Sequence, residues 1–471
     1  MGVLSPILYA ALAFGVFQWL APRFSAEEQR WLRISLGAHV LFAFANVFLT
    51  VYLLGGGDML WYHRDGSKIA DLWWSNPGVW TEEVVKLTLR LTARFPFWIH
   101  GASGSNSTGA MFGISAWLMI LTGKSLYGAC VIVSCLNFFS RLAMYAVVRR
   151  LLDPKATRLA LFAIMLFPSA LFWTGGLLKE GVAMVGIGYT FYGAYRIAEH
   201  SDFVRGAFWV VVGGFTSYLV KPYVLFPFAI GIPIWYLAAR IKRDSQGAGA
   251  LLTPFRLVAA GGIAVGGLAL LAYLVPALSI ETLSDEIAQT QDKWDRVSAA
   301  SSAIQISRSA DRGLLGVLIS APMGLVNALT RPWLFEARNP QRMFAAVENT
   351  LLLILLFLGL RRNGAVSSLR ALLSEPVVLF CLAYFAIFGV AVGISTGNIG
   401  SISRYRAPLL AFYGVFIVFL YATGQGAEKV VEARVGEQGT ASRRRSSRDP
   451  VTGRRRPLRA RERLPVVAEE A

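Results

Sequence analysis

Long runs of apolar residues, separated by shorter polar connections, are the main pattern along this chain of 471 residues. A helix needs about 20 mostly apolar residues to cross the ~30 Å hydrocarbon core of a bilayer. Runs of about that length lie near 4–21, 34–54, 125–148, 157–174, 181–197, 205–220, 222–240, 257–278, 346–360, 376–394 and 406–423. The pattern predicts an all-α fold, a polytopic transmembrane bundle of about 11–12 helices.

One additional apolar run, at 109–122, is shorter than the others. Counting it as a full crossing breaks the alternation of connections between the two sides of the membrane. We therefore expect this run to form an interfacial or re-entrant helix, with a full crossing as the alternative.

The short connections that are rich in Lys and Arg set the expected orientation, because such connections are enriched on the cytoplasmic side. The basic residues fall in four clusters and the tail: Arg23, Arg30 and Arg33; Arg149, Arg150, Lys155 and Arg158; Arg240, Lys242 and Arg243; Arg361, Arg362 and Arg370; Arg443–Arg445 and Arg454–Arg456. With these inside, alternation places 55–108, 173–180, 218–223, 279–345 and 397–406 outside. The two longest, 55–108 and 279–345, are predicted to be large non-cytoplasmic loops.

Composition supports the membrane assignment and defines the tail. The chain is 55% hydrophobic and only 16% charged, with a formal net charge of +18, whereas soluble proteins are about 25% charged. We expect residues 1–423 to form the transmembrane domain. Residues 424–471 are rich in Arg, Ser, Gly and Pro, and we expect a disordered, basic cytoplasmic tail that contacts anionic lipid rather than nucleic acid.

The first candidate site follows the second apolar run, in the stretch GGGDMLWYHRDGSKIAD. Asp58 would lie at the membrane surface, followed by Tyr62, His63 and Asp65. Asp58 and Tyr62 are four residues apart, so a helix that starts there places both on one face. Alternatively, Asp58 only caps an interfacial helix.

Charged residues at the outer ends of later spans are further candidates, since a charge beside a span is costly and indicates function. Lys179 and Glu180 follow a Gly-Gly pair in FWTGGLLKEG, and as helix neighbours they should reach different partners. Lys221 stands alone in SYLVKPYV. The alternatives are a solvated pair for Lys179 and Glu180 and snorkelling to the interface for Lys221.

Two more segments place arginine on the predicted outer side. TRPWLFEARNP contains Arg331 and Glu336 beside aromatic residues, which are typical of sugar stacking but equally of an interfacial anchor. SRYRAPLLAF places Arg404 and Arg406 directly before the last span. Because arginine is expected on the inside, its presence outside indicates a purpose, and its guanidinium matches phosphate oxygens.

These residues resemble a known pattern. GGDMLWYHRDGSKIAD is similar to the D-x-x-x-Y-h stretch, FPSALFWTGGLLKEG to the Pro-containing span, and SRYRAPLLAFYGVFIVF to the R-Y-R-x-P-l-l opening of GT-C superfamily membrane glycosyltransferases. The chain thus looks like a bacterial polyprenyl-phosphate-sugar-dependent transferase of the mannosyltransferase or aminoarabinose-transferase kind. The resemblance touches most of the membrane region through short, degenerate motifs.

The resemblance implies a GT-C-like fold and roles for individual residues. Asp58 would be the catalytic acidic residue, acting as general base on the acceptor or orienting the donor. Lys179, Arg404 and Arg406 would pair with phosphate. The chain departs from the family where many members carry paired acidic residues, because Asp58 stands between Gly57 and Met59. His63 and Asp65 are the nearest substitutes.

The predicted function is an inverting sugar transfer from a polyprenyl-phosphate carrier to a glycan, lipid or protein acceptor. It would take place on the periplasmic or extracellular side of a bacterial inner (plasma) membrane. A polysaccharide polymerase or ligase, a transporter or flippase of lipid-linked precursors, and a scaffold are the alternatives. The sequence identifies no definite cofactor; a divalent cation held by Asp58 and Asp65 is the one candidate, although two carboxylates alone do not make a metal site. Zinc-protease, P-loop and G-x-S-x-G spacings are missing from the sequence.

Overall fold

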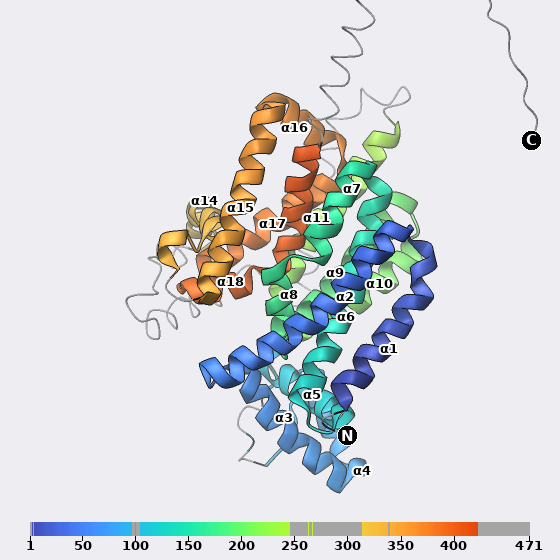
Figure 1. The fold of residues 1–471 in the computed structure, drawn as a ribbon, viewed down its shortest axis with the longest axis vertical. Coiled ribbons are helices and arrows are strands. Elements are labelled where there is room, and N and C mark those ends of the chain that lie inside the picture. The colour runs from blue at the N-terminus through green and yellow to red at the C-terminus, as the bar shows by residue number, and fades with distance from the viewer. Residues whose placement is uncertain are drawn as a thin grey trace, which may run out of the picture.

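The computed structural model describes residues 2, 4–96, 99, 104–244, 262, 266, 313–337 and 340–422. Every regular element in this part of the chain is a helix, as Figure 1 shows. The prediction of an all-α fold is therefore confirmed for these residues. The apolar run at 257–278, apart from Gly262 and Gly266, and the tail at 424–471 lie outside the described residues.

The first half of the chain forms the following helices: α1 (Ser5–Leu20), α2 (Ala26–Phe48), α3 (Asp58–Ser75), α4 (Pro77–Thr88), α5 (Ser107–Thr122), α6 (Leu126–Leu151), α7 (Pro154–Met165), α8 (Pro168–Thr174), α9 (Lys179–His200), α10 (Phe203–Val220) and α11 (Phe226–Asp244). A π-helical turn, η2 (Leu49–Leu54), extends α2. Pro154 and Pro168 occupy the first positions of α7 and α8, where a missing backbone N–H costs nothing. The break between these two helices thus divides the run predicted at 157–174.

The second half contributes a smaller set: α14 (Gly313–Thr330), α15 (Pro340–Asn363), α16 (Ala365–Ser374), α17 (Pro376–Ser395) and α18 (Ile399–Tyr405), followed by a last helix at Ala407–Ala422. The last two helices meet at a bend of 41°, so the final span is broken at Arg406. Pro408 lies in the first turn after the bend.

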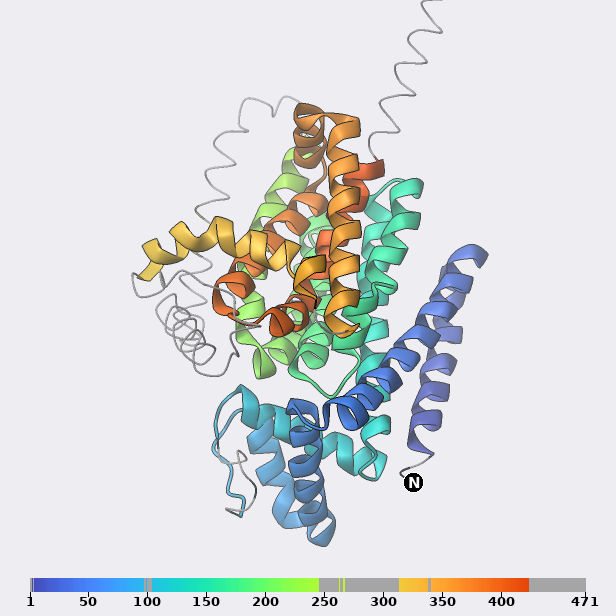
Figure 2. The same ribbon diagram turned by 60° about the vertical axis from the view of Figure 1, so that its left-hand side comes forward.

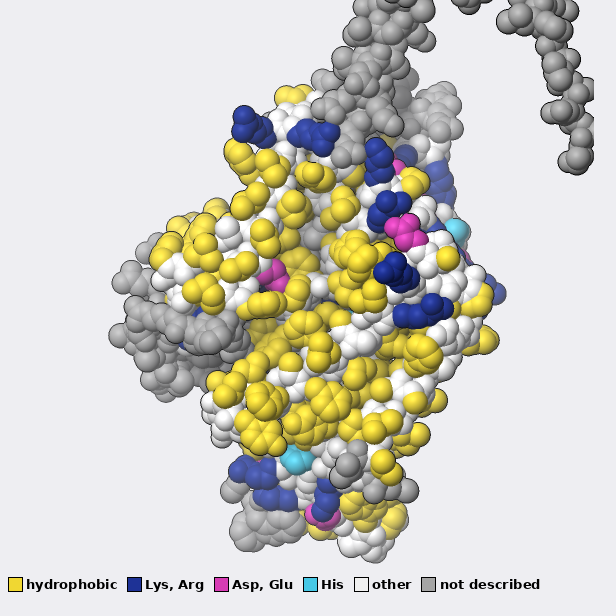
Figure 3. All heavy atoms as spheres, in the orientation of Figure 1, with side chains coloured by type: hydrophobic (Ala, Val, Ile, Leu, Met, Phe, Trp, Pro, Cys, Tyr) yellow, Lys and Arg dark blue, Asp and Glu magenta, His cyan; other side chains and the backbone are white. Residues whose placement is uncertain are grey.

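Length and hydropathy identify the membrane crossings among the described residues. Eight helices are long and apolar enough to cross a bilayer, and a ninth results if the bent pair around Arg406 is one span. A multi-pass membrane protein is therefore confirmed. Large apolar side chains are exposed along α1 and α15, for example Leu12 and Phe357, as expected for surfaces that face lipid tails. Figure 3 shows the resulting apolar band between two charged ends of the molecule.

The centre of the bundle is α6, which packs against α1, α2, α5, α7 and α9. Glycines allow the backbones of α9 and α10 to approach closely where the two helices cross. A Cβ at Gly193 would lie 2.6 Å from the Gly206 carbonyl oxygen, and one at Gly186 would lie 2.3 Å from that of Gly213. Small residues at such crossings are typical of helix packing inside membranes.

The two large outer loops predicted from the sequence are partly helical. Within 55–108, α3 and α4 form helices that pack with α5 in a layer at one end of the bundle, shown at the bottom of Figure 2. The 16 residues of α5 extend about 24 Å, less than a bilayer core. In the second segment, α14 packs against α17 and α15 begins at Pro340. Residues 279–312 lie outside the described part.

Candidate functional site

Asp58 lies between the end of the extended α2 and the layer of helices α3, α4 and α5, which we call the end layer. After η2 the chain turns through Gly55 at φ 63° and Gly57 at φ 118°, conformations that favour glycine. Asp58 is then the first residue of α3, and Gly57 rather than Asp58 is the residue that precedes the helix. The carboxylate thus lies in the first turn, where the helix dipole stabilises negative charge, and its side chain is 46% exposed.

Arg404 connects Asp58 to a second carboxylate. Its Nη1 donates to Asp58 Oδ2 at 2.8 Å, and its Nε lies 3.0 Å from Glu180 Oε1. Arg404 comes from α18 and Glu180 from the start of α9, so the bridge joins three helices that are distant in sequence. The guanidinium fork suits such double pairing because its N–H groups point in fixed directions.

Glu180 is fully buried and has a second cation. Lys221, at the break between α10 and α11, donates from Nζ to Glu180 Oε1 at 2.8 Å. Lys221 also lies over the rings of Tyr405, at 4.5 Å, and Tyr223, at 5.6 Å. This lysine is 4% exposed, so it does not snorkel to the interface, the alternative weighed from the sequence. Its ion pair and ring contacts offset the cost of burying its charge.

Lys179 turns away from Glu180, as predicted for neighbours on a helix. Its Nζ donates to Ser107 Oγ at 3.0 Å and to Thr108 Oγ1 at 2.9 Å, both in the first turn of α5. Burial, together with the charge of Lys221, lowers the pKa of Lys179 to about 8. A cation held by two hydroxyls at a helix N-terminus lacks an anion in direct contact, and both the α5 and α9 dipoles favour one there.

Tyr62 lies one turn beyond Asp58 and is 3% exposed. Its ring packs edge-on against Phe112 at 5.3 Å. Burial raises the pKa of its phenol, and the nearby Asp58 carboxylate adds to that shift. The phenol therefore stays protonated at every ordinary pH and is suited to donating a hydrogen bond.

A cavity of about 330 Å³ opens beside Asp58 and Arg404. It is bounded by η2, by the start of α3 and by the start of α18. Its lining combines polar and aromatic side chains with glycines: Asn46, Thr50, Leu54, Gly56, Gly57, Asp58, Met59, Phe172, Trp173, Leu178, Arg342, Asn398, Gly400, Ser401 and Arg404. The volume is that of a pocket for a small polar ligand or a sugar ring.

Ion pairs join four of the residues predicted from the sequence, Asp58, Arg404, Glu180 and Lys221, and Lys179 adjoins them as the chain neighbour of Glu180. We call them the polar cluster. Three cations and two carboxylates leave one positive charge in excess. Only Asp58 has a side chain that is close to half exposed, while Glu180 and Lys221 are buried beneath it. The cluster thus combines one solvent-accessible carboxylate, Asp58, with buried groups that are mostly positively charged.

His63 and Asp65 lie on the same helix but have other partners. His63 Nε2 is 3.0 Å from the Lys124 carbonyl oxygen. Asp65 is buried and accepts from Trp61 Nε1 at 2.9 Å, with Lys68 Nζ at 3.1 Å. Asp58 and Asp65 thus pair with different cations. In the described part of the chain, no group of three or more His, Cys, Asp and Glu residues is placed to hold a metal ion.

Arg331, Glu336 and Arg406 belong to a second region, at the turn between α14 and α15. Arg406 is 1% exposed and donates from Nη1 to the carbonyl oxygens of Ala328, at 3.3 Å, and Arg331, at 3.0 Å. Arg331 Nη1 lies 3.6 Å from Glu336 Oε1. These contacts satisfy the end of α14 and do not involve the polar cluster.

Several residues at the site were not singled out from the sequence. Tyr223 and Tyr405 flank Lys221, and Ser107 and Thr108 hold Lys179. KPY places Tyr223 two positions after Lys221, which is a local signal for that contact, whereas Tyr405, Ser107 and Thr108 reach their partners through tertiary packing. No protein-family model, curated protein or solved structure matches this chain.

Proposed function

We propose that this chain is a membrane glycosyltransferase that moves a sugar from a polyprenyl-phosphate carrier to an acceptor on the non-cytoplasmic face. The observation that carries the proposal is the ion pair between Asp58 and Arg404 at the edge of a polar cavity. Glycosyl transfer from a lipid phosphate requires a base for the acceptor hydroxyl and cations for the leaving phosphate. The polar cluster contains both.

In the proposed reaction, the phosphate of the donor takes Arg404 and Lys179 as partners. The contact of Arg404 with phosphate frees Asp58 from its ion pair. The Asp58 carboxylate then accepts the proton of the acceptor hydroxyl, whose oxygen attacks the anomeric carbon. The bond between that carbon and the phosphate oxygen breaks, and its electron pair stays on the phosphate. Attack opposite the leaving group inverts the anomeric configuration.

The surrounding residues support this assignment of roles. Glu180 is buried and holds Arg404, and Lys221 is buried and pairs with Glu180, so neither residue is assigned a contact with substrate. Trp173 and Phe172 line the cavity and offer apolar faces to a sugar ring. The basic residues Arg149, Arg158 and Arg243 lie at the other end of the spans, which favours an orientation with the polar cluster outside.

A transporter or flippase of lipid-linked precursors is a less suitable explanation of this geometry. Transport sites of that kind lie near the middle of the bilayer, between broken helices of repeated halves. The polar cluster lies at the starts of α3 and α9, against the end layer formed by α3, α4 and α5. A polymerase or ligase would use the same cations but would not need Asp58 as a base.

The test compares wild type with Asp58→Asn in cells at matched expression and membrane insertion. Surface glycans and polyprenyl-linked sugars are quantified by mass spectrometry. Loss of a general base lowers rates by about 100-fold or more, so we expect the donor lipid to accumulate and the modified glycan to disappear. Asp71→Asn is the matched control, since Asp71 lies on the same helix and pairs with Lys124 at 2.8 Å.

Unchanged glycans in the Asp58→Asn cells would overturn the role of Asp58 as base. Lost glycans and accumulated lipid-linked glycan in Arg404→Ala cells, but not in Asp58→Asn cells, would favour the polymerase or ligase. Accumulation of lipid-linked sugar that stays protected from added enzymes in intact cells would favour the transporter instead.

A further inference from the structure

A second polar pocket lies at the opposite end of the bundle, where α2 and α7 begin and α6 ends. Its volume is about 280 Å³. The lining includes two glutamates and two arginines: Ser25, Glu27, Glu28, Trp31, Tyr145, Arg149, Leu152, Pro154, Thr157, Arg158, Leu161 and Phe162. The 29-residue span Ala26–Leu54 separates it from Asp58 by about 40 Å at 1.5 Å per residue. The pocket therefore belongs to a different site.

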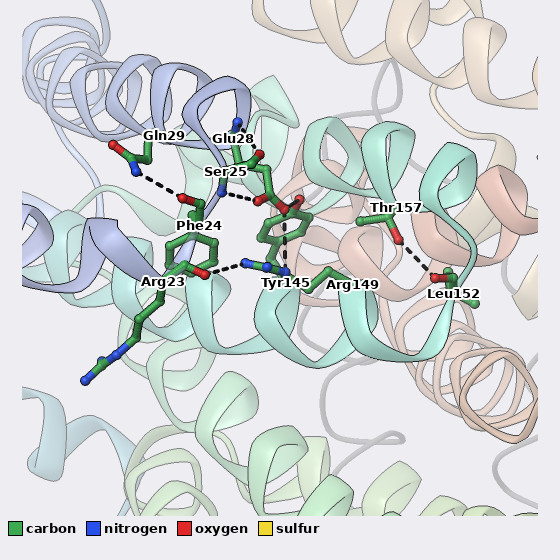
Figure 4. A network of polar contacts seen from close by, with 9 residues as sticks. All are labelled: Arg23, Phe24, Ser25, Glu28, Gln29, Tyr145, Arg149, Leu152 and Thr157. Atoms are coloured by element: carbon green, nitrogen blue, oxygen red, sulfur yellow. Dashed lines mark hydrogen bonds and ion pairs between the residues drawn. The ribbon is translucent and has the colours of Figure 1, made fainter.

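The floor of the pocket is a closed network, shown in Figure 4. Glu28 accepts the Tyr145 hydroxyl at 2.6 Å and the Ser25 backbone N–H at 2.8 Å, and Arg149 Nε lies 3.5 Å away. Arg149 Nη1 also donates to the Arg23 carbonyl oxygen at 3.1 Å. These contacts fix Glu28 and Arg149, so the floor is arranged in advance for a ligand.

The mouth of the pocket is held much more loosely. Arg158 Nε lies 3.5 Å from Glu27 Oε1, and the two side chains are 69% and 56% exposed. An exposed ion pair of this kind contributes little, because water screens it and both side chains lose freedom. A ligand that brings its own positive and negative groups can replace it, leaving each residue with a partner.

One wall of the pocket is apolar and faces the bilayer. Trp31 and Phe162 meet edge to face at 4.8 Å, one from α2 and one from α7, and Phe162 is exposed. Both helices belong to candidate membrane spans. Aromatic residues at the end of a span typically mark the level of lipid headgroups. Figure 3 shows acidic and basic side chains together just beyond the apolar band at this end of the molecule.

From this arrangement we propose that the pocket binds the headgroup of a zwitterionic phospholipid with a primary ammonium, that is, a phosphatidylethanolamine. The phosphate pairs with Arg158 and Arg149. The ammonium replaces Arg158 as the partner of Glu27. The acyl chains leave the pocket along Trp31 and Phe162.

The charges of the pocket favour this lipid over others. An anionic headgroup such as that of phosphatidylglycerol would meet Glu27 and Glu28 without a cation of its own. Phosphatidylcholine carries a quaternary ammonium that cannot donate a hydrogen bond to a carboxylate. Of the three headgroups, only that of phosphatidylethanolamine offers both a phosphate for the two arginines and a hydrogen-bonding ammonium for Glu27. The bound lipid would hold the start of α2 against α7, and this role does not depend on the proposed function.

The test measures binding of the three lipids, with identical acyl chains, to the full-length protein in detergent by native mass spectrometry. We expect phosphatidylethanolamine to bind about tenfold more tightly than phosphatidylcholine, the effect of about one charge-assisted hydrogen bond. Glu27→Gln should remove that preference. Arg158→Gln should weaken all three lipids, because the phosphate contact is common to them. Arg30→Gln is the control, since Arg30 is exposed on α2 outside the pocket lining.

Equal affinity of the wild type for the three lipids would overturn the proposal. So would a preference for phosphatidylethanolamine that survives Glu27→Gln, or strongest binding of phosphatidylglycerol, which would indicate a general anionic-lipid surface. Each variant's thermal unfolding without added lipid shows whether it is folded. Glu27 and Arg158 are exposed, so we expect their substitution to leave that transition unchanged.

Discussion

The Arg404 guanidinium lies 2.8 Å from the Asp58 carboxylate, although 346 positions separate the two residues. The same guanidinium lies 3.0 Å from Glu180. One arginine thus positions an accessible acid and is itself positioned by a buried one. A substrate anion that takes over Arg404 would release Asp58 at the moment when a base is needed.

Substitution of Glu180 should destabilise the fold strongly. Glu180→Gln leaves Lys221 buried without its anion and Arg404 with only one carboxylate. Breaking a buried pair by removing one partner costs about 3–5 kcal/mol, and we expect a loss of that size in unfolding free energy. Chemical denaturation of the purified protein in detergent provides the measurement.

The double variant Glu180→Gln/Lys221→Gln tests the same pair by a thermodynamic cycle. Residues in contact show interaction energies of about 0.5–3 kcal/mol, so the double variant should be more stable than the sum of the two single losses predicts. Purely additive losses would mean that the 2.8 Å contact between Lys221 and Glu180 carries no coupling. Asp71→Asn serves as the exposed control.

Arg404→Lys should lower activity while leaving the protein folded. Lysine keeps the positive charge but cannot reach Asp58 and Glu180 at the same time from one planar group. Loss of one preorganised contact to a developing anion costs about 10²–10³ in kcat. Sugar-transfer kinetics in proteoliposomes measure the effect, and a kcat within a factor of two of wild type would argue against the bridging role.

The sequence predicted the elements and the chemical types at the site better than it predicted their contacts. Apolar run length and the placement of arginine identified Asp58, Glu180 and Arg404 as residues at one end of the spans. Which carboxylate pairs with which cation depends on how α3, α9 and α18 meet. That relationship depends on tertiary packing between segments distant in the chain, which local pattern does not encode.

Arg406 shows that a similar position in the sequence does not predict a similar contact. It stands two residues from Arg404 and looked equivalent in SRYRAP. Residues two apart in a helical turn point to different sides. Arg406 therefore reaches carbonyl oxygens at the end of α14, whereas Arg404 reaches Asp58. His63 and Asp65 diverge from Asp58 because their side chains pair with residues of the end layer instead.

The first outer loop is more regular than its length alone indicates. The sequence predicts a large non-cytoplasmic loop at 55–108, and the spacing of Asp58 and Tyr62 suits a helix that starts there. GDMLWYHRDGSKIADLWWS carries apolar residues at helical spacing over its whole length, and α3 buries Met59, Tyr62 and Ile69 against the rest of the molecule. Low mean hydropathy indicated that this segment does not span the membrane, but periodicity was the better guide to its structure.

Ligand binding at the polar cluster should fall as pH rises through about 8. Burial and the charge of Lys221 lower the pKa of Lys179 to about 8, so the cationic form that pairs with phosphate is lost above that value. Lys179→Arg should shift the decline to higher pH, because arginine keeps its proton. Affinity for a polyprenyl phosphate, measured from about pH 6 to about pH 10, reports the effect.

The same pKa shift has a defined sign in stability. The folded-state pKa of Lys179 is below its unfolded value, so the folded protein holds this proton less firmly than the unfolded chain does. Unfolding free energy from this group should therefore rise with pH between about 8 and the unfolded value of 10.5. A decrease over that range that is absent in Lys179→Met would contradict the burial of Lys179.

Gly57→Ala should displace Asp58 without any steric clash. Gly57 has φ 118°, which side-chain-bearing residues rarely adopt, and a Cβ there would meet nothing within 4 Å. The alanine therefore acts only through backbone strain, which costs about 1–3 kcal/mol for such a conformation. The strain is relieved if the turn rearranges, and that rearrangement moves the start of α3 and with it Asp58. Gly37→Ala is the matched control, because Gly37 is equally open, has no positive φ and lies on α2 outside the cavity lining. We expect Gly57→Ala to lower sugar transfer as much as Asp58→Asn lowers it, while Gly37→Ala remains near wild type. Equal activity of the two alanine variants would show that the position of Asp58 does not depend on the left-handed turn.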